Sequence, residues 1–566
     1  MITTPQAAPP RTIRTWAFNG QIIRYGRGPF AVHAVCQTFY YGALFLPGLL
    51  EKAVFDRITG QGTAGFDVWA LIALYVSVGI ARLVATYAET WAGYTFRYTT
   101  GALVRRNLLA ATLRRPGALT PSVSAGEAVN RYRDDVAEVC DFPTWLPDVA
   151  GNAVAFVVAV AVMVGINAAI TLVVFLPLVA TFFVGRLAWS RIHFYWRARG
   201  LAGDAVTGFL GELFGAVQAV KVAGAERDTV RHFAALNDVR RQAAVRSGLL
   251  WAAIDSIQST AATFGTGIVL LLVGQAMSAG HFTVGDFALF VYYLTFTTGF
   301  PSYLGSFLAD YNQQAAAITR LVDLVPDEPA AVLVESHPVY MHSDPPPLSP
   351  PPAQRTDRLE RLDVRGLTYQ HPDSGRGIVG VDFSLARGEF VVITGQIGSG
   401  KTTLLRALLG LLPRQAGEIA WNGTPVADAA ALFCAPRAAY TPQVPRLFSA
   451  SLRDNILLGW PATAADLTKA LERAVMEPDV AALEQGLDTL VGPRGVRLSG
   501  GQVQRSAAAR MLVRAPDLLV CDDLSSALDV ETDRQLWERV LAPNLAGDRP
   551  TCLVVSHRRA VLRRAD

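Results

Sequence analysis

The stretch Gly395-Gln-Ile-Gly-Ser-Gly-Lys-Thr402 decides the fold of the carboxyl-terminal part of the chain. It fills every fixed position of the pattern Gly-x-x-x-x-Gly-Lys-Ser/Thr. The apolar segment 390–394 precedes it and predicts a short strand, and 403–412 follows it with the periodicity of a helix. A glycine-rich turn without a ligand is the plainer alternative. The complete pattern and its flanks favour a phosphate-binding loop between a strand and a helix.

Each part of this loop has its own expected role. Its glycines let the backbone turn tightly, so that successive N–H groups point at phosphate oxygens beside the positive end of the helix. Lys401 is expected to reach the β- and γ-phosphates of a nucleotide, and the Thr402 hydroxyl to bind Mg²⁺. The nucleotide-binding residues expected here are Gly395, Gln396, Gly398, Ser399, Gly400, Lys401, Thr402 and Thr403.

The rest of the chain is too apolar for a purely soluble protein. Hydrophobic residues make up 51% of the 566 residues, and the mean hydropathy is +0.28. About 20 apolar residues cross one hydrocarbon core, and 149–185 carries no charge at all. We therefore expect six membrane spans, near 28–50, 68–88, a hairpin at 145–185 that turns near 165–167, 250–277 and 284–309.

Basic residues predict the orientation of these spans. The long polar excursions 89–142 and 186–248 hold seven and ten Lys and Arg, whereas the short loops hold only Lys52 and Arg57. By the positive-inside rule the excursions and both ends of the chain are cytoplasmic. We expect these excursions to be helical, with a short transverse helix near each tip, at 109–115 and 209–220. Simple connectors are the alternative.

Polar and aromatic groups inside the expected spans have two possible roles. Arg82 and Asp255 are expected either to face a water-filled cavity or to pair structurally, because an ionisable group in lipid is costly. Aromatic side chains can line an apolar route or simply pack. The aromatic residues concerned are Tyr40, Tyr41, Phe287, Tyr292, Tyr293 and Phe296.

Two further motifs follow the phosphate-binding loop. The segment 517–523 predicts a buried strand that ends in Asp522 and Asp523, the first placed to hold Mg²⁺ and the second to point at an attacking water. Leu498-Ser-Gly-Gly-Gln502 comes next to a helix expected at 502–513. The Ser499 hydroxyl and the amides of the glycines can bind anionic phosphate at that helix end.

Together these motifs resemble the ATP-binding cassette (ABC) transporter family, in its exporter-type half-transporter form. The resemblance covers the chain from about residue 12 to its end, and the Leu-Ser-Gly-Gly-Gln run is highly specific. It implies a multidomain fold, in which an all-α transmembrane domain of six helices joins an α/β P-loop NTPase cassette with an α-helical subdomain. The implied parts are a basic segment at 1–27, the transmembrane domain at 28–324, a Pro-rich linker at 325–358 and the cassette at 359–566.

The resemblance also implies partners and roles. Two cassettes pair head to tail, so that Ser499, Gly500, Gly501 and Gln502 serve the nucleotide of a second half-transporter. Gln443 matches the loop that touches Mg²⁺ and the membrane domain, and His557 matches the switch histidine at the γ-phosphate. The segment 526–529 matches the loop that crosses between the sites. The tips of the excursions match the helices that transmit cassette closure.

The chain departs from the family pattern at several positions. Asp523 stands where the family usually has glutamate, one methylene longer, so hydrolysis at this chain's own loop is expected to be slow. That favours a heterodimer, whose competent site this chain's signature would complete. The adenine-stacking aromatic falls at His371, with Tyr369 as the second candidate. Pro493 stands in a segment that often holds glutamate, and the sequence stops at Asp566, which suggests a truncated record.

The sequence thus predicts a multi-pass cell-membrane ATPase that uses ATP and Mg²⁺ and exports a small molecule, lipid or peptide. A homodimeric exporter with Asp523 as a competent base and a nucleotide-gated regulator without net pumping are the alternatives. A net charge of +4 does not suggest a nucleic-acid partner.

Overall fold

A computed structural model describes residues 13–61, 65–119, 123, 125–278, 282–297, 299–341, 343–347, 357–493, 495–543 and 549–566. It divides into two compact units. The helical unit comprises Met1–Leu109 and Val123–Met341, and the sheet unit comprises Ala110–Ser122 and His342–Asp566. One division, after Met341, falls inside the stretch expected to be a linker, and the other two set 110–122 apart from the rest of the helical part of the chain.

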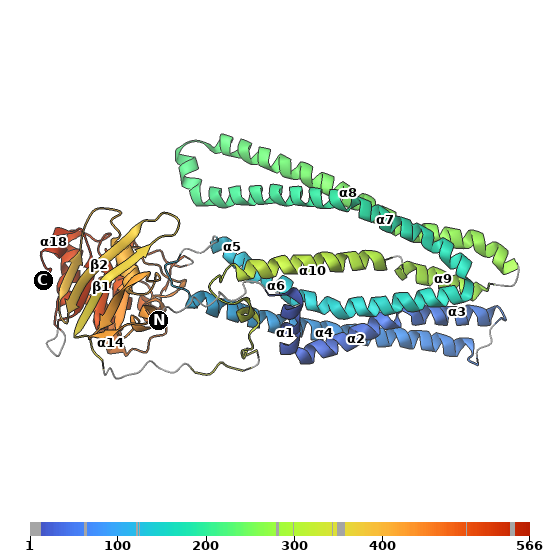
Figure 1. Cartoon of the computed structure of the whole chain (residues 1–566), viewed down its shortest axis with the longest axis horizontal. Coiled ribbons are helices and arrows are strands. Elements are labelled where there is room, and N and C mark those ends of the chain that lie inside the picture. The colour runs from blue at the N-terminus through green and yellow to red at the C-terminus, as the bar shows by residue number, and fades with distance from the viewer. Residues whose placement is uncertain are drawn as a thin grey trace, which may run out of the picture. The chain divides into compact units, whose positions relative to one another are not determined.

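The helical unit consists of long helices that run beside one another (Figure 1). Among the described residues, three helical stretches are long and apolar enough to cross a membrane, and they are Val68–Arg114, Gly126–Val173 and Phe194–Val222. The number of six spans remains a prediction. The main helices are α1 (Thr15–Tyr25), α2 (Arg27–Gly42), α3 (Leu46–Ile58), α4 (Val68–Arg114), α5 (Ala125–Asn130), α6 (Val136–Asp141), α7 (Trp145–Val222), α8 (Glu226–Ser278), α9 (Val284–Thr297) and α10 (Phe300–Val322).

The expected hairpin lies within α7. The backbone of Asn167 leaves the helical region, at φ −155° and ψ 103°. Figure 1 shows that α7 folds back on itself. The Asn167 side-chain oxygen accepts a hydrogen bond from Ile170 N at 3.0 Å, which caps the start of the second arm. The sequence thus located this turn correctly.

The prediction of a separate short helix at the tip of each excursion is wrong. The first segment, 109–114, is the last part of α4, and the second, 209–220, is the last part of α7. Each long helix continues until a stop signal ends it, Pro116 after the first and Gly224, at φ +61°, after the second.

Inside the helical unit, two of the candidate route residues have structural contacts. The Arg82 guanidinium carbon lies 4.6 Å from the centroid of the Tyr40 ring, and Tyr293 is fully buried and donates to Phe45 O at 2.9 Å. These contacts favour packing for both residues. The side chains of Asp255, Gln258 and Phe296 and the segments 1–12 and 348–356 lie outside the described part of the structure.

The sheet unit contains two main sheets among its described residues. One is parallel, in the order β3-β10-β9-β6, and the other is antiparallel, in the order β2-β1-β4-β5. A small β7-β8 ladder accompanies them. The strands are β1 (Arg361–Gln370), β2 (Gly377–Ala386), β3 (Phe390–Ile393), β4 (Ala416–Trp421), β5 (Thr424–Pro425), β6 (Ala438–Thr441), β7 (Ala450–Ser451), β8 (Leu490–Val491), β9 (Leu518–Asp522) and β10 (Thr551–Val555).

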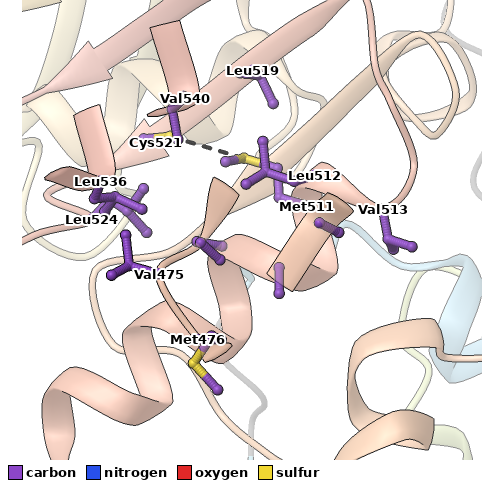
Figure 2. Close-up of a cluster of buried hydrophobic side chains, with 14 of the residues drawn as sticks. Val475, Met476, Met511, Leu512, Val513, Leu519, Cys521, Leu524, Leu536 and Val540 are labelled. Carbon is purple, nitrogen blue, oxygen red and sulfur yellow. Dashed lines mark hydrogen bonds between the residues drawn. The ribbon is translucent and has the colours of Figure 1, made fainter. Parts of the chain in front are cut away.

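The parallel sheet separates two hydrophobic cores. Along β9, Leu519 and Cys521 belong to one core, and Leu518 and Val520 belong to the other, because side chains alternate along a strand. Figure 2 shows Cys521 directed toward Met511, with their sulfur atoms 3.9 Å apart. The helices of this unit are α11 (Lys401–Leu408), α12 (Ala429–Leu432), α13 (Leu452–Leu457), α14 (Ala464–Arg473), α15 (Glu477–Ala482), α16 (Gly500–Leu512), α17 (Val530–Leu541) and α18 (Arg559–Leu562).

The two cores position the helices that carry the candidate site. Helix α11, which follows the phosphate-binding loop, contributes Leu404, Leu405 and Leu408 to one core. Helix α16, which follows the signature, contributes Met511 and Leu512 to the other. Both helices are therefore fixed to opposite faces of the same parallel sheet.

Candidate functional site

Four loops meet at the carboxyl edge of the parallel sheet. Because β3, β6, β9 and β10 run in the same direction, their carboxyl ends share one edge. The phosphate-binding loop follows β3, Gln443 follows β6, Asp522 ends β9, and His557 lies two residues beyond β10. The topology therefore gathers candidate residues that are widely separated in the sequence.

The phosphate-binding loop has the backbone conformation that its glycines predict. Gly395, Gly398 and Gly400 have φ values of +149°, +82° and +92°, which L side chains rarely adopt. A Cβ atom on Gly400 would also lie 2.9 Å from Ile378 Cγ2. Lys401 Nζ donates to the carbonyl oxygens of Gly395 and Gln396, at 3.0 and 2.8 Å, so its ammonium group is held over the loop.

Asp522 is the buried carboxylate of this edge. Its residue is 1% exposed, and its Oδ2 atom has no hydrogen-bond partner. Burial raises the pKa of Asp522, whereas a hydrogen bond from Thr402 acts in the opposite direction. Burial and the nearby charge of Asp522 also raise the pKa of Tyr440 to about 12.

A magnesium ion fits this donor set. Mg²⁺ prefers oxygen ligands, and the Asp522 carboxylate with the Thr402 hydroxyl supplies two of them beside the expected phosphate position. An ion there would also compensate the unpaired Oδ2 atom, whose burial costs free energy.

Asp523 lies at a sharp turn after the strand. Its φ is +52°, its N–H donates to Val555 O at 3.0 Å, and its carbonyl accepts from Ser526 N at 3.2 Å. Aspartate is one of the few L residues that enter this left-handed region readily. Its side chain is half-buried.

The remaining candidates at this edge differ in exposure. Gln443 and His557 are exposed, as contact with a nucleotide or a neighbouring domain requires. His371 is exposed as well, but Tyr369 is only 2% exposed and belongs to the core. Its ring packs edge-on against His371, with centroids 5.0 Å apart, so these contacts favour a packing role for Tyr369 and leave His371 as the accessible candidate for stacking on adenine. Alternation along β1 turns the Tyr369 side chain inward.

The signature forms the N-terminus of α16. Ser499 caps the helix through a capping box: Gln502 N donates to Ser499 Oγ at 3.3 Å, and Ser499 N donates to Gln502 Oε1 at 2.8 Å. Gln502 Nε2 donates to Asp479 Oδ1 at 3.1 Å. Both ends of the Gln502 side chain are therefore used within the unit. Ser499 and Gly500 remain exposed at the helix end, with Gly501 half-buried beside them.

Comparison with known proteins bears on both units. The family model described as "ABC transporter transmembrane region" matches residues 41–300, and the one described as "ABC transporter" matches 378–526. Together the two matches cover more than half of the chain.

The chain belongs to the ABC transporter family.

Several curated relatives are similar over different lengths. A beta-(1→2)glucan export ATP-binding/permease protein, NdvA of Brucella melitensis, is 31% identical over 56% of this chain, and the match spans about half of that relative's length, 50%. An ATP-dependent lipid A-core flippase of Chromobacterium violaceum is 27% identical over 98% of this chain and 92% of its own. A putative multidrug export protein, YgaD of Bacillus subtilis, is 26% identical over 92% and 88%.

A solved structure supports the fold. A bacterial Atm1-family ABC exporter with ATP bound superimposes with a TM-score of 0.75, covers 95% of this chain and 92% of its own, and is 21% identical. At that identity it shows the fold alone. The transmembrane helical domain and the ABC cassette expected from the sequence are thus confirmed.

The structure also shows contacts of this ABC cassette that the sequence motifs do not reveal. The Gln504 side chain is 4% exposed and reaches the loop 526–529. The Arg558 guanidinium reaches the same loop from the other side. The sequence could have indicated a buried role for Gln504, because it is a polar residue on the face of α16 that otherwise carries buried small and apolar side chains.

The tip of the first excursion belongs to the sheet unit of this ABC transporter. Ala118 N donates to Leu411 O at 2.9 Å, and Ala118 and Leu119 pack against the core that contains α11. This contact lies one short helix from the phosphate-binding loop, because Leu411 follows closely on α11.

Proposed function

We propose that this chain is one half of a dimeric, ATP-driven exporter of the ABC transporter family. One observation carries the proposal: the buried Asp522 carboxylate, whose Oδ2 atom has no partner, is hydrogen-bonded to Thr402 of a complete phosphate-binding loop, in a chain that also has helices suited to cross a membrane. Relatives named for glucan export, for multidrug export and as a lipid A-core flippase support it.

In the proposed mechanism the chain's residues mainly position and neutralise a phosphoryl group. The amides of 395–402 hold the phosphates, and Lys401 moves from its carbonyl partners to phosphate oxygens. Asp522 and Thr402 would hold Mg²⁺, which would supply positive charge against the phosphates. His557 and Gln443 reach the γ-phosphate side, and His371 stacks on the base.

The proposed dimer is unequal. Asp523 is one methylene too short to orient the attacking water well, and a misplacement of about 1 Å can cost roughly a hundredfold in rate. Ser499, Gly500 and Gly501 are exposed or half-exposed at the end of a well-capped helix, ready to meet a partner's nucleotide. We therefore propose that a second half-transporter with a longer carboxylate forms the competent site with this signature.

The first excursion provides the proposed link to transport. Because Ala118 and Leu119 pack beside Leu411, a movement of the cassette would carry the end of α4 with it. We propose that both excursions, the N-terminus and the cassette are cytoplasmic, and that the cargo is a small molecule, lipid or peptide.

Transport into inside-out vesicles tests the proposal. The full-length chain is purified with its co-purifying partner, reconstituted, and offered a panel of labelled glucans, lipids and hydrophobic drugs with and without ATP. We expect ATP-dependent uptake of one class, lost in Lys401→Ala and kept in Lys469→Ala, which removes an exposed lysine on α14. ATP-driven conformational change with no uptake of any class would instead favour a nucleotide-gated regulator.

A further inference from the structure

The loop 526–528 is clamped from two directions by side chains. From α16, Gln504 Nε2 donates to Ser526 Oγ at 2.6 Å, and Gln504 Oε1 accepts from Ala527 N at 2.9 Å. Both polar ends of one buried amide are thus used on two consecutive residues of the loop.

The second side of the clamp is Arg558. Its Nη2 atom donates to Leu528 O at 2.8 Å and to Ser526 O at 3.4 Å, and its Nη1 atom lies 3.3 Å from Asp533 Oδ2. The Asp533 side chain is 4% exposed, so it holds the guanidinium in a water-poor place. Arg558 directly follows His557, the residue that the proposed function places at the γ-phosphate of this chain's own nucleotide.

These contacts join two ends of the cassette that serve different nucleotides in the proposed dimer. Gln504 lies shortly after Ser499 on the same helix, and α16 is fixed to the sheet by Met511 and Leu512 (Figure 2). A helix packed in this way moves as a rigid body. Hydrogen bonds therefore link Arg558, the neighbour of His557, through the loop 526–528 to Gln504 on the helix that carries the signature.

We propose that Gln504 and Arg558 are positioning residues that couple the state of this chain's phosphate-binding loop to the signature that faces the partner's nucleotide. The proposal rests on the proposed function, because the signature needs a partner site to act on. It predicts a regulatory connection between the two sites that runs within one chain, through hydrogen bonds that can be removed one at a time.

Four substitutions of the full-length chain, purified as its native dimer, test the coupling. Gln504→Leu keeps the volume but removes both hydrogen bonds, and Gln504→Glu keeps the acceptor for Ala527 N and can accept from the Ser526 hydroxyl. Arg558→Lys keeps the charge but not the two-armed donor. Arg473→Lys is the matched control, because Arg473 also donates to two main-chain carbonyls, of Arg539 and Val540, away from the nucleotide loops.

We expect Gln504→Leu and Arg558→Lys each to lower kcat for ATP at least tenfold, with the affinity for a fluorescent ATP analogue changed less than twofold. Gln504→Glu should keep kcat within threefold of wild type, and Arg473→Lys within twofold. The kcat of the Gln504→Leu/Arg558→Lys double variant should be little lower than that of the more impaired single variant, because the two residues act in series. Near-wild-type kcat in a folded Gln504→Leu dimer, or equal losses in the Leu and Glu variants, would overturn the proposal.

Hydrogen exchange gives a readout that does not depend on hydrolysis. In the wild-type dimer, ATP with Mg²⁺ should protect the amides of 395–402, 526–528 and 499–503. In Gln504→Leu the phosphate-binding loop should still be protected, and the signature should not. Protection of the signature in both wild type and Gln504→Leu would contradict the proposed coupling and would leave the proposed function intact. The absence of any protection in wild type would contradict the proposed function itself.

Discussion

The two phosphate-directed ends of the cassette differ in how their nucleotide-facing groups are held. At the phosphate-binding loop, Asp522 Oδ2 is buried without a partner and Lys401 is held by carbonyl oxygens of its own loop. At the signature, Ser499 and Gln502 satisfy each other in a capping box, and Asp479 accepts from both Gln502 and Arg505. The capping box at the signature is thus preorganised by the protein, with Arg505 Nε buried beside it without a hydrogen-bond partner. At the phosphate-binding loop, the buried Asp522 Oδ2 atom lies where a ligand can complete it.

This contrast suits a chain that receives its own nucleotide at one end and presents a finished surface to another subunit. Preorganised donors need no rearrangement when charge arrives. A buried carboxylate oxygen without a partner, by contrast, destabilises the empty protein and favours the binding of a cation. Each prediction below tests one of the two ends with a substitution at that end.

The largest effect is expected at the signature. Ser499→Ala should lower ATP hydrolysis by the assembled dimer at least tenfold, because the hydroxyl that faces the partner's nucleotide is lost. Thr463→Ala is the matched control, since Thr463 forms the same kind of capping box with Asp466 on α14. Each loss of a cap should cost about 1 kcal/mol of stability. Equal ATP hydrolysis rates in Ser499→Ala and Thr463→Ala would show that the signature is not part of the nucleotide site.

At the phosphate-binding loop, Gly400→Ala should weaken ATP binding about tenfold. The new Cβ would lie 2.9 Å from Ile378 Cγ2, at a backbone φ of +92°. Gly380→Ala has a similar φ, +63°, and open space around the new Cβ, so it isolates the cost of the backbone conformation. Titration with a fluorescent ATP analogue should show unchanged affinity for this control. A similar loss in both variants would mean that the clash at Gly400 is irrelevant.

A smaller effect concerns stability without ligand. Asp522→Asn should stabilise the nucleotide-free protein by about 1 kcal/mol at pH 7, because it removes a buried charge, and should abolish stabilisation by Mg²⁺-ATP. Burial raises the pKa of Asp522, so the folded protein binds this proton more tightly than the unfolded chain.

The pH dependence of that difference follows from the sign of the shift. Wild type gains stability relative to Asp522→Asn as the pH falls from 7 through the raised pKa, so the gap between their melting temperatures should narrow. Thermal unfolding of both proteins across this range checks it. A gap that widens toward acid would show that the folded protein stabilises Asp522 as the carboxylate, which contradicts a raised pKa.

Much of this arrangement is local in the sequence and was therefore predictable. The phosphate-binding loop needs glycines at 395, 398 and 400 whatever surrounds it, and Asn167 marks a turn by its own side-chain cap. The class of fold follows from apolar stretches and from the strand, loop and helix around Lys401.

Other features depend on neighbours that are distant in sequence. Tyr369 looks like a free aromatic in the sequence, and only the pairing of β1 with β2 and β4 turns it into the core. Gln504 and Arg558 meet at 526–528 because α16 and β10 pack against the same strand, β9. The tips of the excursions were expected as separate helices, yet α4 runs on to Arg114 and the part of α7 after Asn167 runs on to Val222.

The most direct measurement of the central claim is the ATPase rate of this chain, purified without a partner and reconstituted in lipid nanodiscs, as wild type, Asp523→Asn and Asp523→Glu. We predict a very low rate for wild type, less than a threefold change for Asp523→Asn, and an increase of at least tenfold for Asp523→Glu, which restores the missing methylene. A robust wild-type rate that collapses in Asp523→Asn would show instead that Asp523 is a competent base and that the chain works as a homodimer.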